Sequence, residues 1–529
     1  MKNFNVIKTR DELLSCIGTG NIALWGAGKY CAYVLDDVIR NEMLHNIKCI
    51  FVSDNLLVNN PMYVCGLPVT TIIEYEKYGK PNIVLAVSEA VSIPILEFLN
   101  HAGIYPVAQI SNELVAILRT VCKNPFIDLL NYSIPKEVDS INKADLYIDA
   151  LFQNRNNTNE FVYHSNEPLI LKHDDPKLLA YYLPQFYTFD ENDEWWGRGF
   201  TEWSNVTRST PQFIGHYQPQ LPIDVGFYDL ENPKIMKRQI ELAKYYGIYG
   251  FCFYYYWFSG KKLLHKPIEM FLENKSLDFP FCLFWANITW TKTWVHDSLN
   301  ERSVLAEQKY LDKDPQRFIS DILPFLKDSR YIKINGAALL IVFVTNEIPR
   351  LKQTVQLWRK EAQKEGINLY LAKVKMIDCD ESVLDDDFDE YVEFLPQGID
   401  AMDITSTIDF IHPLCKNRVY SYEYMTNNYK RYKSSQVMRS VFTAWDNTPR
   451  LLTNSSIYYQ STPQMYQEWL TNVILTSKKL RGEKDNYIFV NAWNEWAEGA
   501  HLEPDRRYGY AYLQATANAI KEVRCRINS

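Results

Sequence analysis

The sequence lacks long apolar runs, paired cysteines and an excess of basic residues, and each absence excludes a class of protein. No stretch reaches about eighteen consecutive apolar residues, so we expect no transmembrane helix. The ten cysteines include no CxxC pair and no tight Cys/His cluster, which argues against a disulfide scaffold and a zinc site, and we expect no metal. A net charge of −8 without a long basic block argues against nucleic acid as a partner.

A signal peptide is a further absence. The first residues, MKNFNVIKTRDELLSC, carry charges where a signal peptide has its apolar region. Scattered cysteines without a pairing pattern are typical of a reducing compartment. Together these features predict a cytoplasmic protein.

Aromatic residues are abundant instead, with 36 Tyr, 26 Phe and 13 Trp among 529 residues. They indicate either large aromatic cores or sites that stack flat ligands or the faces of sugars. Their positions along the chain must decide between the two. The length itself predicts two or three domains, one of which can be a large α/β domain.

Residues 1–120 predict a small Rossmann-like α/β domain. The segments NIALW, IKCIFVSD and PNIVLAVS have strand character, and AVSIPILEFLNHAGI is a helix that ends at a glycine. Gly26 and Gly28 follow the first strand, with Cys31 in place of the usual third glycine. Either this turn binds nothing, or the phosphate of a nucleotide or nucleotide-sugar lies at the helix N-terminus and Asp54 meets a ribose hydroxyl. The polar, Asn-rich residues 121–176 predict a linker with irregular or short helical structure.

Residues 177–529 alternate between strands and helices in one rhythm. We predict eight strands, in LLAYYLPQFY, IYGFCFYYYWF, FPFCLFWANITW, AALLIVFV, INLYLAKV, DEYVEFLP, VMRSVFTAW and NYIFVNAW. Eight strands, mostly separated by helices, predict a (β/α)8 TIM barrel. A doubly wound sheet would show a similar rhythm and differs only in strand count. The sixth unit, residues 397–437, contains no clear helix.

Tryptophans and polar side chains recur where the predicted strands end. In a barrel of this kind the site lies at the C-terminal ends of the strands. Aromatic rings beside Asn, Asp and Glu suit a ligand with an apolar face and a hydroxylated rim, which describes a sugar ring. The candidate ligand-binding residues are Trp196, Glu202, Trp203, Tyr255, Trp257, Trp285, Asn287, Trp290, Trp445, Asp446, Trp493, Asn494, Trp496 and Glu503.

Glu495 and Glu498 follow the eighth strand directly and are the candidate catalytic residues. Three residues apart on a helical turn, their side chains share a face, with about 5–6 Å between Cβ atoms. Two carboxylates that flank one bond are the usual apparatus of glycosyl chemistry, one protonated and the other ionised. Apolar ring surface and a neighbouring like charge raise the pKa of one member of such a pair. The alternative is a solvated loop pair.

Three other carboxylates have competing interpretations. Glu202 either begins a helix or binds a sugar hydroxyl. Asp446 precedes a segment with turn character, so it either forms the turn or touches ligand. Glu503, before a proline, either touches ligand or holds its loop.

Several long segments, in order, resemble one family. LLAYYLPQFY, WWGRGFTEWSNV, HYQPQLP, GIYGFCFYYYWF, AWDNTPR and NAWNEWAEGAHLEPD are similar to the WbsX-type proteins, which are bacterial and related to glycoside hydrolase family 99, the endo-α-1,2-mannosidases. The resemblance covers about residues 177–525 and implies a (β/α)8 barrel that requires no cofactor. Genes for WbsX-type proteins are usually found among genes for lipopolysaccharide O-antigen and other surface polysaccharides. The proteins are often labelled glycosyltransferases. The N-terminal segment resembles small Rossmann-like modules beside polysaccharide enzymes.

The resemblance also implies a mechanism. The hydrolase relatives retain anomeric configuration through a 1,2-anhydro sugar, which makes Glu495 the base for the sugar's 2-hydroxyl and Glu498 the acid/base. The acceptor, water or a sugar hydroxyl, stays open. The implied partners are an oligosaccharide or polysaccharide substrate and other polysaccharide-biosynthesis enzymes, with peripheral membrane association if the substrate is lipid-linked. Two alternatives remain: a nucleotide-sugar-dependent glycosyltransferase that uses the N-terminal domain, and a non-catalytic glycan-binding protein.

Overall fold

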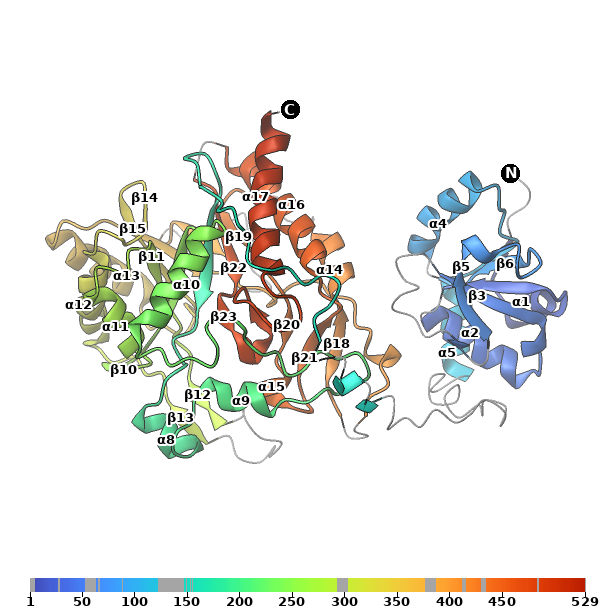
Figure 1. Cartoon of the computed structure of the whole chain (residues 1–529), viewed down its shortest axis with the longest axis horizontal. Helices are drawn as coiled ribbons and strands as arrows, with labels where there is room; N and C mark the ends of the chain where they lie inside the picture. Colours follow the sequence, from blue (N-terminus) through green and yellow to red (C-terminus); the bar gives the residue numbers. More distant parts are fainter. Residues whose placement is uncertain are drawn as a thin grey trace. The chain divides into compact units, whose positions relative to one another are not determined.

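The chain forms two compact units, shown in Figure 1. The structure is a computed structural model, and it describes residues 5–26, 29–52, 63–64, 67–87, 89–121, 147–148, 150–152, 154, 156–292, 303–375, 387–411, 415–429, 434–482 and 485–528. The N-terminal unit comprises Met1–Asp145 with Ser406–Asp409, and the barrel unit comprises Leu146–Thr405 and Phe410–Ser529.

A seven-stranded sheet in the order β1-β7-β6-β2-β3-β5-β4 forms the N-terminal unit. All neighbours are parallel except β4 and β5. The strands are β1 (Asn5–Ile7), β2 (Ile22–Trp25), β3 (Ile47–Val52), β4 (Tyr63–Val64), β5 (Leu67–Thr71), β6 (Asn82–Leu85) and β7 (Ala108–Ile110). The helices are α1 (Arg10–Gly18), α2 (Lys29–Arg40), α4 (Glu89–His101) and α5 (Asn112–Val121). A small α/β domain is therefore confirmed.

Helices cover both faces of this sheet because its strands are apolar on both sides. On β2, Ile22 and Leu24 belong to one buried cluster with side chains of α1, α2 and α5. Ala23 and Trp25 belong to a second cluster, which contains Leu99 of α4. Successive side chains of β2 point to opposite faces of the sheet, so this one strand contributes to the core on each side.

Gly26 has a packing reason to be glycine. Its φ is +115°, and an added Cβ would lie 2.6 Å from Cγ1 of Val87 and 3.0 Å from the carbonyl oxygen of Ala86. The turn after β2 therefore passes directly against the end of β6. Gly28 and Asp54 lie outside the described residues, so nucleotide binding at this turn stays a prediction.

Eight parallel strands form a closed barrel in the second unit, and closure excludes the doubly wound alternative. Their order is β8-β9-β11-β15-β16-β17-β19-β22, and β22 pairs with β8. The strands are β8 (Lys177–Tyr182), β9 (Gly250–Phe258), β11 (Phe281–Trp285), β15 (Ala337–Val342), β16 (Leu369–Val374), β17 (Glu390–Val392), β19 (Val437–Phe442) and β22 (Tyr487–Asn491). Each lies in the segment predicted for it, so the TIM-barrel prediction is confirmed.

Helices surround the barrel (Figure 1). They are α10 (Pro233–Tyr245), α11 (Lys266–Glu273), α12 (Asp314–Leu326), α13 (Leu351–Lys364), α14 (Tyr422–Asn428), α16 (Pro463–Arg481) and α17 (Ala511–Asn528). Side-chain caps and prolines begin two of them: Asn232 Oδ1 accepts from the backbone N–H of Lys234 on α10, and Thr462 Oγ1 accepts from that of Met465 on α16. None of the helices in the described part of the chain combines the length and apolar character that a membrane crossing needs.

The sixth unit departs from the regular repeat. Its helix, α14, has only seven residues and begins where Ser421 Oγ accepts from the backbone N–H of Tyr424. Before it, β18 (Arg418–Ser421) pairs with β21 (Ser456–Tyr459), which also pairs with β20 (Trp445–Asp446). This small sheet lies beyond the barrel strands and explains why residues 397–437 show no long helical pattern.

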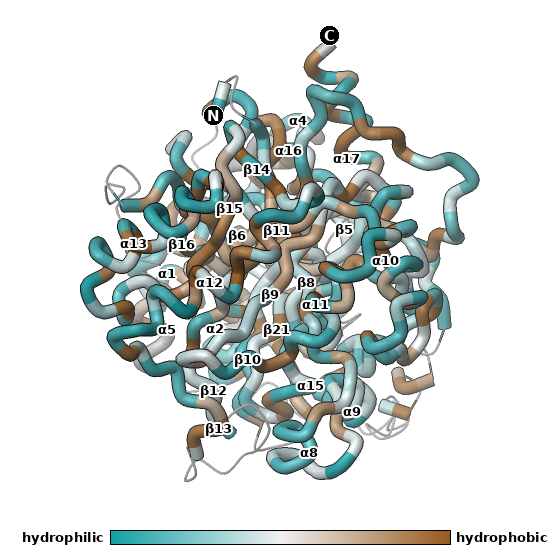
Figure 2. The backbone as a smooth tube through the Cα atoms, turned by 90° about the vertical axis from the view of Figure 1, so that its left-hand side faces the viewer, coloured by the Kyte–Doolittle hydropathy of each residue, from teal (hydrophilic) through white to brown (hydrophobic). Residues whose placement is uncertain are grey.

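Aromatic side chains fill the barrel interior. The ring of Tyr181 on β8 lies 5.8 Å from that of Tyr254, 5.5 Å from Phe284 and 5.2 Å from Phe489, measured between centroids. These rings come from four strands, so alternate positions of the strands point inward. In Figure 2 the tube is largely brown over β11 and β15 and teal over the outer turns of α10 and α13.

The intervening positions point to the helix layer. The rings of Tyr255, Trp257 and Trp285 pack against Phe318 of α12, and Trp285 stacks on it at 4.2 Å. The sequence predicts these three residues to be ligand-binding candidates. Their outward placement is a correction, and its reason is the two-residue period of a strand, because Tyr254 and Tyr256 occupy the inward positions.

The described part of the predicted linker lies against the barrel. Thr158 donates from its N–H to the carbonyl of Arg507, and Leu169 from its N–H to the carbonyl of Tyr245. Leu169 is buried in the core of the barrel unit. Residues 156–176 therefore lie against the barrel and are hydrogen-bonded to it.

Candidate active site

Three segments meet beyond the C-terminal ends of the barrel strands. After β8, α9 (Glu202–Arg208) carries Glu202 at its first position. After β19, α15 (Thr448–Leu451) carries Arg450. After β22, β23 (Asn494–Glu495) and a 3-10 turn, η6 (Trp496–Glu498), carry the two glutamates of the predicted pair. The strand ends of a barrel converge on one face, which brings these three segments together.

One guanidinium contacts three carboxylates. Arg450 donates from Nε to Glu202 Oε1 at 2.8 Å and from Nη2 to Glu495 Oε2 at 3.0 Å. Its Nη1 donates to Glu498 Oε1. Because both members of the predicted pair bond to the same planar group, their carboxylates converge on one point of the site. We call Glu202, Arg450, Glu495 and Glu498 the carboxylate cluster.

The carboxylate cluster combines one guanidinium with three buried carboxyl groups. Burial and the neighbouring Glu498 raise the pKa of Glu495 to about 8, against the opposing effect of Arg450. Burial also raises the pKa of Glu498, and Arg450 again opposes the change. A pKa of about 8 favours the protonated form of Glu495 at neutral pH, so the pair as a whole carries a proton.

The carboxylate cluster is partly exposed, so a ligand has limited access to it. The side chains of Glu498 and Arg450 are 12% and 11% exposed, whereas that of Glu202 is 1% exposed. Among the described residues, none donates a hydrogen bond to Glu495 Oε1 or Glu498 Oε2. Each glutamate therefore has one oxygen held by Arg450 and one available to a substrate.

Two tyrosines of β9 face the carboxylate cluster from the barrel wall. Burial first, and then the charge of Glu495, hold the pKa of Tyr254 and of Tyr256 well above its usual range. Their ring centroids are 6.2 Å apart, as expected for neighbours on one face of a strand. They offer neutral phenol groups to a ligand beside the glutamates.

Asp446 and Arg208 hold α15, and with it Arg450, in place. Asp446 Oδ2 lies 2.6 Å from Nε2 of His216 and accepts from Gln218 at 2.6 Å, while its Oδ1 accepts from the N–H of Thr448. Burial alone would raise the pKa of Asp446, but these partners outweigh it and lower that pKa. Arg208 donates to the carbonyl oxygens at the end of α15. Asp446, a candidate for ligand contact, thus has its acceptors taken by the protein.

Glu503 is the anchor of the loop that carries the glutamate pair. Its carboxylate is buried and accepts from Trp496 Nε1 at 2.7 Å, Trp493 Nε1 at 3.2 Å, Gln239 Nε2 at 2.7 Å and Tyr228 Oη at 2.9 Å. Burial raises its pKa to about 7 against the effect of these four donors. The contacts favour the loop-holding interpretation of Glu503.

We predict that Glu503→Gln destabilises the protein more than it changes the chemistry. The amide has one acceptor oxygen, and its N–H groups would face donors, which leaves buried indole N–H groups without partners. The free energy of unfolding should fall by about 1–3 kcal/mol, measured by urea denaturation. The control is Glu468→Gln on the exposed face of α16. Equal stability of the two variants would contradict the anchoring role.

Two asparagines brace the strand ends. Asn494 Oδ1 accepts from the N–H of Leu183 at 2.8 Å, and its Nδ2 donates to the carbonyl of the same residue at 3.0 Å. Asn287 makes the same two-way contact with Val344 and also donates to Tyr310 Oη. Both side chains are fully buried, so their contacts fix loops of the site.

The tryptophans divide into two groups. The first group is buried and donates its indole N–H groups to acceptors within the protein; it consists of Trp203, Trp257, Trp285, Trp493 and Trp496. Those that are half-buried and keep ring surface for a ligand are Trp196, Trp290 and Trp445. Trp290 lies 5.0 Å from the ring of Tyr256, which connects it to the carboxylate cluster.

Sequence reasoning missed Arg450, Tyr254 and Tyr256. Arg450 stands in AWDNTPR, a segment singled out for its Trp and Asp alone. The two tyrosines stand in FYYYWF. Alternate residues of a strand point to the same face, so an inward position for one of them implies an inward position for the other. Among the described residues, no group of three His, Cys, Asp or Glu side chains could hold a metal ion.

Comparison with known proteins identifies the family. The sequence model described as Glycosyltransferase WbsX matches residues 178–516. Two curated relatives, each named Uncharacterized protein WxcX and from Xanthomonas campestris pv. campestris strains B100 and ATCC 33913, are 38% identical over 349 residues. That alignment covers 65% of this chain and 49% of each relative, so the chain spans about half the length of the curated relatives it matches.

Similar solved structures are more distant. A glycoside hydrolase-like protein is 12% identical with a TM-score of 0.43, covering 68% of this chain and 98% of that one. The GH99 endo-alpha-mannosidase from Bacteroides thetaiotaomicron is 13% identical with a TM-score of 0.40, covering 66% of this chain and 98% of that one. The family match spans most of the barrel and confirms the resemblance seen in its motifs. The chain belongs to the Glycosyltransferase WbsX family.

Proposed function

We propose that the barrel unit cleaves or transfers a glycosidic bond and that Glu495 and Glu498 are its acid/base pair. One observation carries the proposal: Arg450 holds both carboxylates at one point, each with a free oxygen and a raised pKa. A buried pair that shares a proton has the two protonation states that glycosyl chemistry needs at the same time. Membership of the WbsX family supports a carbohydrate substrate.

In the proposed reaction, configuration is retained through a 1,2-anhydro sugar. A pKa of about 8 leaves a minority of Glu495 ionised at neutral pH, and the free oxygen of this reactive form takes the proton of the sugar's 2-hydroxyl while O2 forms a bond to the anomeric carbon. The glycosidic bond breaks as the free oxygen of protonated Glu498 gives its proton to the leaving oxygen. Glu498 then takes a proton from water or a sugar hydroxyl, whose oxygen attacks the anomeric carbon. The bond between O2 and the anomeric carbon breaks, and O2 regains its proton from Glu495. Arg450 is the positioning residue for both.

We also propose the setting of this reaction. The substrate is an α-linked glycan of a bacterial surface polysaccharide, such as O-antigen, or its lipid-linked precursor, and the protein works beside other enzymes of that biosynthesis. The family description and the bacterial relatives support this setting. A lipid-linked substrate would bring the protein to the membrane surface.

Product analysis tests the proposal. The protein is incubated in H2¹⁸O with defined α-linked oligosaccharides and with lipid-linked precursors, and the products are weighed by mass spectrometry. Hydrolysis gives shorter glycans with one ¹⁸O, and transfer gives longer glycans without it. The first product should keep the α configuration, read by ¹H NMR before mutarotation. A β product would overturn the mechanism, and no product from any substrate would overturn the function.

A further inference from the structure

The small sheet of the sixth unit lies beside the loop that carries the glutamate pair. Its strands are paired in the order β18-β21-β20, and in Figure 1 they follow one another away from β23. A Cβ added to Gly499, the residue directly after Glu498, would lie 3.1 Å from the backbone nitrogen of Asp446 on β20. The small sheet therefore continues the site on the side of Glu498.

Cross-strand pairing brings three aromatic side chains to one face of this sheet. Tyr420 on β18 is paired with Tyr458 on β21, and Tyr458 with Trp445 on β20. Paired residues of neighbouring strands point to the same face. We call these three residues the aromatic row. With about 4.7–4.9 Å between neighbouring strands, the row extends over about 10 Å, which is more than one pyranose ring covers.

The opposite face of the small sheet is closed. Val419, Ile457 and Asp446 are paired across the same three strands, and all three are buried. On that face Asp446 contacts His216. Successive side chains of a strand point to opposite faces, so Trp445 points away from His216.

The aromatic row keeps ring surface and unused polar groups. Tyr420 and Trp445 are half-buried, and Tyr458 between them is 8% exposed. Among the described residues, no group bonds to Tyr420 Oη, Tyr458 Oη or Trp445 Nε1, and all three atoms reach solvent. The row thus offers aromatic edges and three polar atoms to a ligand.

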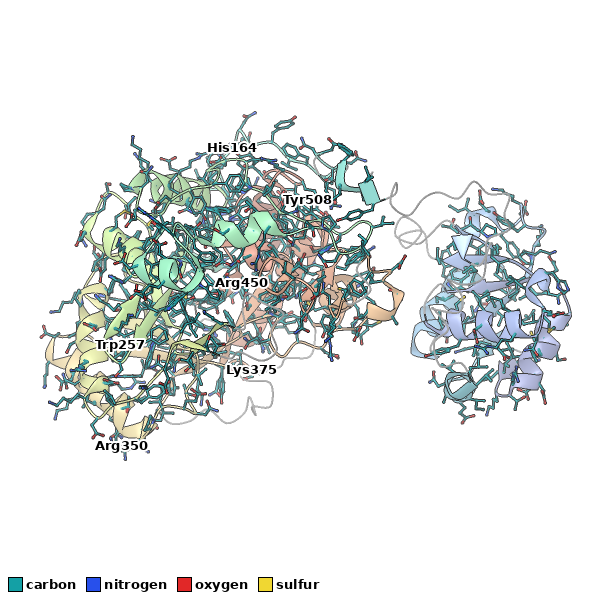
Figure 3. The ribbon with its side chains drawn as sticks, turned by 90° about the horizontal axis from the view of Figure 1, so that it is seen from below. His164, Trp257, Arg350, Lys375, Arg450 and Tyr508 are labelled. Carbon is teal, nitrogen blue, oxygen red and sulfur yellow. The ribbon has the colours of Figure 1, made fainter. Side chains whose placement is uncertain are left out.

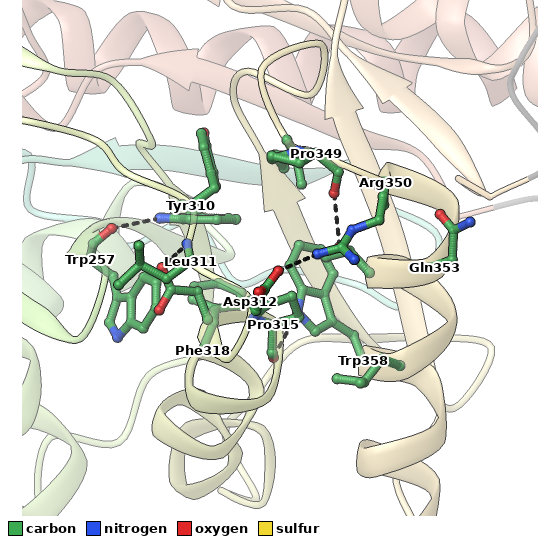
Figure 4. A pocket seen from close by; sticks show the side chains of 15 residues that line it. Trp257, Tyr310, Leu311, Asp312, Pro315, Phe318, Pro349, Arg350, Gln353 and Trp358 are labelled. Carbon is green, nitrogen blue, oxygen red and sulfur yellow. Dashed lines mark hydrogen bonds and ion pairs between the residues drawn. The ribbon is translucent and has the colours of Figure 1, made fainter.

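Aromatic clusters elsewhere in the barrel unit differ from the aromatic row in access. The cavity between α12 and α13 (Figure 4) is lined by Trp257, Trp285, Phe318 and Trp358, which pack on one another and are at most 2% exposed. Figure 3 shows Trp257 well apart from Arg450. The aromatic row, in contrast, is partly open and adjacent to the glutamates.

Polar side chains flank the aromatic row on the same face. Arg418 is paired with Ser456 two residues before the pair of Tyr420 and Tyr458. Arg418 is exposed and Ser456 is half-buried. No described residue accepts a hydrogen bond from the guanidinium of Arg418. Its N–H groups and the serine hydroxyl suit the hydroxyl groups at the rim of a sugar ring.

We propose that the aromatic row binds the part of the glycan that departs with the leaving oxygen and, in a transfer reaction, the acceptor glycan. The assignment of this side rests on the proposed function, in which Glu498 protonates the leaving oxygen. The row begins beside the loop of Glu498, so sugars on the leaving side of the bond reach it. Its rings suit the apolar faces of these sugars, and Arg418 suits their hydroxyls. The substrate is then a glycan with more than one sugar on the leaving side.

Binding is measured by ¹⁹F NMR on the full chain labelled with 5-fluorotryptophan, with the resonance of Trp445 assigned from a Trp445→Phe variant. The probes are methyl glycosides of α-linked disaccharides of mannose, glucose and galactose, and the matching methyl monosaccharides. At least one disaccharide should shift the Trp445 resonance and bind at least about threefold more tightly than its monosaccharide. Tyr420→Ala should remove this advantage, because Tyr420 lies at the far end of the row from Trp445.

The matched control is Tyr163→Ala, which changes an exposed tyrosine outside the small sheet and should keep the advantage of the disaccharide. Far-UV circular dichroism shows whether Tyr420→Ala is folded. Arg418→Ala carries the test if it is not, and it should weaken disaccharide binding at least about threefold. No shift with any disaccharide, or folded variants that bind it as Tyr163→Ala does, overturns the proposal.

Kinetics tests which side of the bond the aromatic row binds. A glycosyl fluoride has no sugar on the leaving side, so Tyr420→Ala should lower kcat/KM at least about threefold more on a glycan than on the fluoride. Equal losses on both substrates overturn the assignment to the leaving side. The binding measurement needs no turnover, so failure of the two proposals is distinguishable. Binding along the row without turnover of any glycan contradicts the proposed reaction, whereas turnover without the binding difference contradicts the aromatic row alone.

Discussion

Glu498→Gln should lower kcat/KM by about 10²–10⁴-fold on a natural glycan, because the amide has no proton to give the leaving oxygen. Glu495→Gln should cost a similar factor, since the amide cannot take the proton of the 2-hydroxyl. The two residues act as a unit, so the double variant should lose little more than the worse single variant. Steady-state kinetics on the glycan found by product analysis gives all three values.

Substrates with activated leaving groups separate the roles of the two glutamates. A 4-nitrophenyl or fluoride leaving group needs little protonation, so Glu498→Gln should recover much of its first-step rate with such a substrate. Glu495→Gln should stay slow, because its missing step does not involve the leaving group. Glu468→Gln on α16 is the matched surface control and should behave as the wild type. If the glutamine variants match it in rate and in glycan affinity, the barrel is a binding module and the catalytic proposal fails.

Arg450→Met should move the pH–rate profile to higher pH and lower its maximum. The reaction requires one shared proton, so activity falls as the pH rises through the upper pKa of the pair, which for Glu495 is about 8. Arg450 lowers the pKa of both glutamates, and removing its charge raises both. Both limbs of the profile should therefore move upward, by about 1–3 pH units. The measurement is kcat/KM from acid to alkaline pH.

The conservative variant separates charge from geometry at this position. Arg450→Lys keeps the positive charge, so the pH profile should stay near that of the wild type. The lysine has no planar fork to hold two carboxylates at once, so the maximum rate should still fall, by about tenfold or more. A merely structural arginine would leave the pH profile of Arg450→Met unchanged, and that outcome would contradict the positioning role.

The barrel could be predicted from the sequence because its signal repeats. Each of the eight strands is a short apolar run bounded by polar segments, and several helices carry their own caps, such as Asn232 before α10. The glutamate pair could be predicted because it directly follows a buried strand. In each case a local pattern determines the local structure, and barrel closure brings the strand ends together.

The ligand-facing residues were harder to predict because burial depends on long-range packing. Trp493 and Trp496 look like ligand-facing rings in the sequence, but Glu503, seven and more residues further on, takes both indole N–H groups into the core. On β9 every position of the run is aromatic, so the sequence does not indicate which alternate residues point into the barrel. Tyr254 and Tyr255, for example, are the same residue type. Arg450 comes from a different strand end, so only the closed barrel shows that it meets the glutamates.

A ¹³C NMR titration of the protein labelled at the glutamate carboxyl carbons tests the shared proton most directly, and it needs no substrate. We predict one carboxyl resonance that titrates near pH 8 and disappears in Glu495→Gln, together with a coupled change at Glu498. Titration of both glutamates near their ordinary values, about 4–5, would contradict the account, because two independent ionised carboxylates at neutral pH leave no acid for the leaving oxygen.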